Sequence, residues 1–143
     1  MTASATTSST TTSSSNTNQD PMSVYYIHPS DASTTQLVST KFSGAGFNNL
    51  KRSMMLTLST KNKLGFVNGT VPVPASNSAE YKYWQRCNNL VISWILFNLE
   101  EHIGKSLLFL STAREIWKDM ENRFGYASMA QVYSLEQQLL EIN

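Results

Sequence analysis

Few residues of this chain have the types and spacing that carry chemistry. Gly44-Ala45-Gly46 precedes an expected helix, as phosphate-binding loops do, but it lacks the third glycine and the Lys-Ser/Thr pair of such loops. His28, His102 and Cys87 are too few and too widely separated along the chain to form a metal site. We therefore expect a flexible helix entry at the glycines, and no metal ligands.

The carboxylates do not form an acid–base pair either. Glu100 and Glu101 are neighbours, and Asp119 and Glu121 are two residues apart, so each pair points to different faces of a helix. Cys87 falls on an apolar helical face, where a thiol is a small core residue rather than a nucleophile. The sequence predicts no catalytic residues, no cofactor and no small-molecule substrate, and hence a protein that is not an enzyme.

The charges are unevenly distributed along the chain. Residues 32–79 contain no acid and five bases, which are Lys41, Lys51, Arg52, Lys61 and Lys63. Residues 100–143 contain seven acids and four bases. This asymmetry suits either contact with nucleic acid or head-to-tail self-association, and it also suits an ordinary solvated surface. If RNA binds, we expect a weak, salt-sensitive contact through Lys51, Arg52, Lys61 and Lys63.

The ends of the chain differ in composition from its centre. Of the first 20 residues, 13 are Ser or Thr, so residues 1–22 are predicted to form a disordered tail. Residues 23–143 are expected to form one domain. No apolar run reaches the roughly 18 residues of a membrane span, so no membrane partner is expected. A single cysteine fits a reducing compartment, and we expect a cytoplasmic protein.

Helical periodicity dominates this domain and predicts an all-α fold of about five helices. An extended N-terminal arm covers residues 23–42, and a connector rich in Pro and Gly, without helix, covers residues 64–78. The apolar stripes that predict the helices are Phe47, Leu50, Met54 and Leu58; Trp84, Cys87, Val91, Trp94 and Ile95; Ile103, Leu107, Leu108 and Leu110; Ile116, Trp117, Met120 and Phe124; and Val132, Leu135, Leu139 and Ile142.

Local signals mark the ends of the last two helices. Thr112 with Glu115, and Ser128 with Gln131, have the spacing of capping boxes, and Gly125 is expected to end the helix between them. The last helix still shows its periodicity at residue 143. We therefore expect a domain truncated at its C-terminus.

Several strings resemble the Gag-type N-terminal region of plant Ty1/copia LTR retrotransposon polyproteins. They are YIHPSD at 26–31, LVS at 37–39, KNKLGFVNG at 61–69, WQRCNNLVISWI at 84–95, AREIW at 113–117 and RF at 123–124. Each string alone is weak, but the series keeps its order over residues 25–143. The resemblance implies a capsid-like helical domain whose copies self-associate into virus-like particles that package element RNA.

The chain departs from this family pattern at several positions. Gly46, Phe47 and Leu50 stand where the family has Asn, Tyr and Trp, and the loss of the Asn and the Trp predicts weaker packing of the first long helix. Gln131 and Glu136 stand where family members often carry bases, which predicts little RNA contact from the last helix.

Two functional interpretations follow. The first is a self-associating capsid-type scaffold that joins copies through the stripe Val132, Leu135, Leu139 and Ile142. The alternative is an RNA-binding or protein-interaction module that derives from a decayed element and does not assemble. A scaffold predicts association that depends on protein concentration, whereas an RNA-binding module predicts binding that falls steeply with salt.

Overall fold

The computed structural model describes residues 18–32 and 38–141. The predicted tail lies outside this part apart from residues 18–22, and Ile142 also lies outside it. The described residues form six α-helices and no strand, which confirms the all-α prediction. The elements are η1 (Pro29–Ala32), α2 (Phe47–Thr60), α3 (Gly65–Asn68), α4 (Tyr81–Phe97), α5 (Glu101–Leu107), α6 (Ala113–Met120), η2 (Glu121–Gly125) and α7 (Tyr126–Glu141).

The core is built on α2 and α4. The predicted stripe of α2 is confirmed, because its buried residues are Phe47, Leu50, Met54 and Leu58. Phe47 and Leu50 are 2% and 1% exposed, so the expectation of a weakly packed first helix is wrong. The predicted apolar face of α4 is likewise buried, through Trp84, Cys87, Val91, Trp94 and Ile95.

The segment after α2 differs from the predicted connector. Gly65–Asn68 forms one helical turn, α3, which buries Phe66 and Val67 against the core. The prolines that exclude helix begin only at Pro72, so they leave this turn free to form. Gly69 ends the turn with a φ of 84°, as a glycine that follows a helix commonly does. The rest of the connector, up to α4, contains no helix, as predicted.

The last three elements form one continuous helical run. Thr112 caps α6, because its Oγ1 accepts a hydrogen bond from the Glu115 N–H at 3.1 Å, as the capping-box spacing predicts. Gly125 does not end the helix, and Ser128 is not a cap, because both residues lie within the run. A π-helical turn, η2, absorbs the glycine, which does not adopt the positive φ that ends helices.

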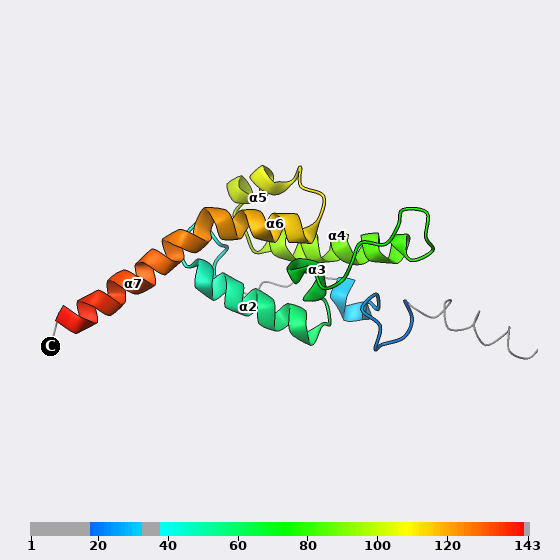
Figure 1. Ribbon diagram of the computed structural model, residues 1–143, viewed down its shortest axis with the longest axis horizontal. Helices are drawn as coiled ribbons and strands as arrows, with labels where there is room; N and C mark the ends of the chain where they lie inside the picture. The colour runs from blue at the N-terminus through cyan, green and yellow to red at the C-terminus, as the bar shows by residue number, and fades with distance from the viewer. Residues whose placement is uncertain (1–17, 33–37, 142–143) are drawn as a thin grey trace, which may run out of the picture.

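The arm is fastened to the far end of α4. Phe42 donates its N–H to the Asn98 carbonyl and accepts from the Glu100 N–H, both at 2.9 Å. Its ring meets Phe124 edge-on at a centroid distance of 4.9 Å, so the arm also contacts η2. Figure 1 shows α2, α4 and α6 packed into one body, from which the helix α7 extends away.

Candidate interaction surfaces

Lys63 is one of the four predicted RNA-contacting residues, but it lies in the interior. It is 0% exposed, and its Nζ donates to the Tyr26 carbonyl oxygen at 2.6 Å. Burial lowers the pKa of Lys63, because the charged amine loses its hydration. A side chain enclosed in this way cannot reach a phosphate, so Lys63 does not belong to an RNA surface.

Lys61 is also engaged within the chain. Its Nζ lies 2.6 Å from Asp31 Oδ1 and 5.4 Å from the centre of the Trp94 ring. Asp31 is only 6% exposed, so this ion pair is partly shielded from solvent. Lys61 and Lys63 together fasten the N-terminal arm to the body of the domain, through Asp31 and Tyr26.

The other two predicted contacts remain at the surface. Lys51 and Arg52 are both exposed, one after the other on α2. The Lys51 Nζ lies 3.9 Å from Glu121 Oε1, in an exposed pair of the kind that contributes little stability. Of the four predicted RNA contacts, only Lys51 and Arg52 are exposed charges.

The apolar face of α7 is open to solvent. Among the predicted self-association residues, Leu135 is 60% exposed and Leu139 is 65% exposed. The side chain of Val132 and the whole of Ile142 lie outside the described residues. Tyr133 and Leu140, which the predicted stripe does not include, are also exposed, at 63% and 75%. The α7 face is hereafter Tyr133, Leu135, Leu139 and Leu140.

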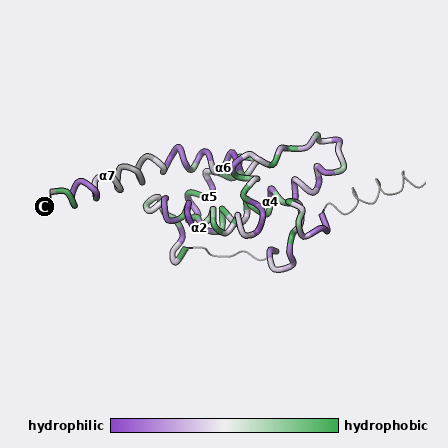
Figure 2. Tube along the Cα trace, turned by 60° about the horizontal axis from the view of Figure 1, so that its bottom comes forward, coloured by the Kyte–Doolittle hydropathy of each residue, from purple (hydrophilic) through white to green (hydrophobic). Residues whose placement is uncertain are grey.

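The π-helical turn η2, from which α7 continues, is anchored to the body by Arg123. Arg123 in η2 donates from both Nη atoms to Ser106 Oγ on α5, at 2.7 and 2.8 Å. Its Nε lies 3.4 Å from Asp119 Oδ1. In Figure 2 hydrophobic colour returns near the tip of α7, well away from the body. An anchored helix with exposed leucines is a surface suited to a protein partner.

A second exposed apolar feature follows α5. Leu108 was expected on the apolar side of this helix together with Ile103 and Leu107, but it is 64% exposed. The prediction is wrong because α5 ends at Leu107, so the helical periodicity no longer applies to Leu108. Phe109 is 79% exposed beside it. Sequence periodicity did not predict the exposure of Leu108 and Phe109.

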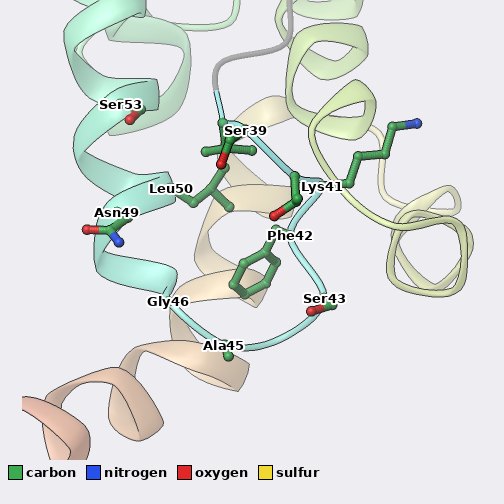
Figure 3. Close-up of a pocket in the computed structure, with 11 residues that line it drawn as sticks. Ser39, Lys41, Phe42, Ser43, Ala45, Gly46, Asn49, Leu50 and Ser53 are labelled. Atoms are coloured by element: carbon green, nitrogen blue, oxygen red, sulfur yellow. The ribbon is translucent and has the colours of Figure 1, made fainter.

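The cavities are shallow and contain few groups that carry chemistry. One, of about 330 Å³, lies between the arm and the start of α2. In Figure 3 the side chains of Phe42 and Leu50 lie between these two segments. Seryl and threonyl hydroxyls, one amide and Lys41 line this cavity. Gly46 precedes α2 with a φ of 75°, which fits the expected role of these glycines as a helix entry.

Two further cavities contain titratable groups. One, of about 440 Å³, is lined by His28, Asp31 and Lys61 among others, and here Asp31 and Lys61 neutralise one another. The other, of about 490 Å³, is lined by Lys41, Glu100, Glu101, His102 and Lys105. Within residues 18–32 and 38–141, no three His, Cys, Asp or Glu side chains are grouped closely enough to hold a metal ion.

Comparison with protein families gives a match over part of this fold. Residues 28–75 match the family described as Gag-polypeptide of LTR copia-type. This match supports a copia-type Gag-like domain in that part of the chain. Comparison with curated proteins and with solved structures finds no match.

The match covers the arm from residue 28 onward, α2 and α3. It includes the ion pair between Lys61 and Asp31 and the exposed Lys51 and Arg52, but not Tyr26, the partner of Lys63. The match supports a Gag-like structural protein. No helix in the described part is long and apolar enough to cross a bilayer.

Proposed function

We propose that this Gag-like chain is a self-associating scaffold subunit whose copies join through the α7 face. In this proposal its assemblies are virus-like particles that form in the cytoplasm and package element RNA. The observation that carries the proposal is the exposure of Leu135, Leu139 and Leu140, at 60%, 65% and 75%, on a helix that stands away from the body.

The physical argument is the cost of leaving these side chains in water. Apolar side chains gain roughly 1.5–3 kcal/mol each when they are fully buried. Isolated exposed leucines are common, but a face of four large side chains on one projecting helix is not. The body of the same copy leaves this face uncovered, so a second molecule is the natural partner.

A pair of double substitutions tests the proposal. Leu135→Asp with Leu139→Asp should abolish the rise of sedimentation coefficient with protein concentration, because each carboxylate would have to be buried in the interface. The helical circular dichroism should stay close to that of the unchanged chain, since both side chains are solvent-exposed already. Unchanged association would contradict the proposal.

The matched control places the same charges elsewhere on α7. Ser134→Asp with Gln138→Asp adds two carboxylates at the same spacing, at exposed positions on the opposite side of the helix. This variant should associate as the unchanged chain does. A loss equal to that of the leucine variant would show that charge on α7, rather than its apolar face, controls association.

The alternative function is RNA binding without assembly, and Lys51 and Arg52 are the observation in its favour. Two phosphate contacts to a single strand give a slope of about −1.4 for log affinity against log salt concentration. RNA binding with that slope, by a chain that stays monomeric at every concentration, would favour this alternative over the scaffold.

A further inference from the structure

The charge of the last helix restricts what can cover the α7 face. Residues 126–143 contain two acids, Glu136 and Glu141, and no base. Glu136 is exposed, and it lies between the leucines of the face in sequence, at one position after Leu135 and three before Leu139. Two α7 helices side by side would therefore bring like charges together without a compensating base. A basic partner suits this helix better.

The outer face of α2 has the complementary character. It carries Lys51, Arg52, Met55 and Leu56, which we call the α2 face. Leu56 is 50% exposed, and Arg52 lies one helical turn before it. No acidic residue occurs anywhere in α2. The helix thus offers two positive charges next to an exposed leucine and a half-buried methionine.

The two faces match in the order of their groups along the helix. On α2 the bases precede the apolar pair by four residues, from Lys51 and Arg52 to Met55 and Leu56. On α7 the acid precedes the leucines by three and four residues, from Glu136 to Leu139 and Leu140. A parallel arrangement brings charge against opposite charge and apolar side chain against apolar side chain.

The lengths of the two helices also agree. α2 has 14 residues and α7 has 16, which correspond to roughly 21 Å and 24 Å. In Figure 1 α7 diverges from the α2 of its own copy. Lys51, Arg52 and Leu56 of the α2 face are exposed. We propose that α7 of one copy docks in parallel on the α2 face of a second copy.

This inference rests on the proposed function, and it defines the kind of assembly. The contact joins two different surfaces, so each copy has both a helix to donate and a face to accept one. Such a heterologous contact continues into rings or chains, whereas a contact between two α7 helices stops at a dimer. In this contact Lys51 and Arg52 face the α7 helix of the second copy.

A mixing experiment tests the arrangement. The acceptor is blocked by Leu56→Asp, and the donor by Leu135→Asp with Leu139→Asp. Each variant alone should be monomeric by sedimentation at concentrations where the unchanged chain associates. An equimolar mixture should give 1:1 dimers and nothing larger, because one intact donor then meets one intact acceptor.

Each other outcome decides the question. If the Leu56→Asp variant associates like the unchanged chain, α7 does not dock on α2, while the proposed function stands. If the leucine variant of α7 still associates, the proposed function fails as well. If Leu56→Asp lowers the affinity for a single-stranded RNA without any effect on association, the α2 face binds RNA, and this inference is wrong.

Two further variants guard against misfolding as the cause. Gln85→Asp adds one carboxylate at an exposed site on α4, and it should associate normally. Arg52→Glu should weaken association, and the double variant Arg52→Glu with Glu136→Arg, in which every contact has the reversed charges, should restore it. Rescue by the reversed charges cannot result from an unfolded chain, whereas failure of rescue would contradict the predicted register of the two faces.

Discussion

Lys63 carries a charge into the interior, where its amine donates to the Tyr26 carbonyl oxygen at 2.6 Å. The loss of hydration lowers its pKa, and the carboxylate of Asp31 partly opposes that shift. A buried polar group is stable only when it is hydrogen-bonded, so the arm and Lys63 depend on one another. The long alkyl chain of the lysine fills space within the core.

Truncation of Lys63 should therefore destabilise the domain. Lys63→Ala leaves the Tyr26 carbonyl without its donor and empties the volume of the side chain. We expect a fall of about 2–4 kcal/mol in the free energy of unfolding, since an unsatisfied buried acceptor alone costs about 1–3 kcal/mol. Urea denaturation followed by circular dichroism measures this change.

The matched control is the exposed lysine of α2. Lys51→Ala should change the free energy of unfolding by no more than about 0.5 kcal/mol, as surface substitutions do. Equal effects of the two substitutions would contradict the burial of Lys63.

The residue types do not predict that Lys63 is buried while the nearby Lys61 is only partly buried. Lys61, Asn62 and Lys63 form a polar run that favours a surface turn. The deciding feature is Asn62, whose φ of 57° turns the chain after α2. Asparagine tolerates this conformation, and an asparagine just after a helix indicates such a turn. The burial of Lys63 depends on the arm, which is distant in sequence.

At the scale of the elements, two glycines have opposite roles. Gly69 ends α3 with a φ of 84°, and a Cβ atom there would collide with the guanidinium of Arg114. Gly125 lies inside the helical run, with open space where its Cβ would be. The first glycine is required by geometry, while the second only weakens its helix.

Alanine at these two positions should therefore act in opposite directions. Gly69→Ala should lower the free energy of unfolding by about 1–2 kcal/mol, the cost of the left-handed conformation, while the flexible end of Arg114 can move aside. Gly125→Ala should raise it by up to about 1 kcal/mol, since alanine favours a helix. Thermal unfolding of both variants measures the difference, and a destabilised Gly125→Ala would contradict the continuous helical run.

Most helices could be predicted because each has one buried stripe, but their junctions could not. The stripes of α2 and α4 follow from periodicity alone. The start of α6 is fixed in addition by Asn88 of α4, whose Oδ1 accepts from the Ala113 N–H at 2.9 Å. Its Nδ2 donates to the Ser111 carbonyl at 3.0 Å. Such contacts between distant segments leave no local pattern.

At the scale of the whole molecule, folding changes the meaning of the charge asymmetry. The sequence places five bases in one region, but Lys63 is buried and Lys61 pairs with Asp31. The exposed positive charges of α2 are then Arg52 and Lys51, which lies 3.9 Å from Glu121, beside the exposed Leu56. The acidic α7 remains as the opposite partner, so head-to-tail contact between copies fits the folded chain better than a broad basic patch.

The arm closes the molecule over Cys87, and this leads to a last prediction. Cys87 is 0% exposed, its Sγ lies 3.4 Å from the Tyr25 carbonyl oxygen, and burial raises the pKa of its thiol. Deletion of residues 1–32 removes this cover. It also removes Tyr26, whose carbonyl oxygen accepts the hydrogen bond of Lys63. The melting temperature should then fall by roughly 5–10 °C, because a hydrogen bond to a charged group is worth about 1.5–3 kcal/mol.

Deletion of residues 1–17 is the matched control, since this Ser- and Thr-rich stretch offers no apolar anchor. It should leave the melting temperature unchanged and Cys87 unreactive toward a thiol reagent. The longer deletion should expose the thiol, lower its pKa toward the ordinary value and speed its modification at pH 8. Equal reactivity in both truncated chains would show that α4 is covered by something other than the arm. If Cys87 of the longer deletion reacts slowly and the melting temperature of that chain is unchanged, the domain folds independently of the contact between Lys63 and Tyr26.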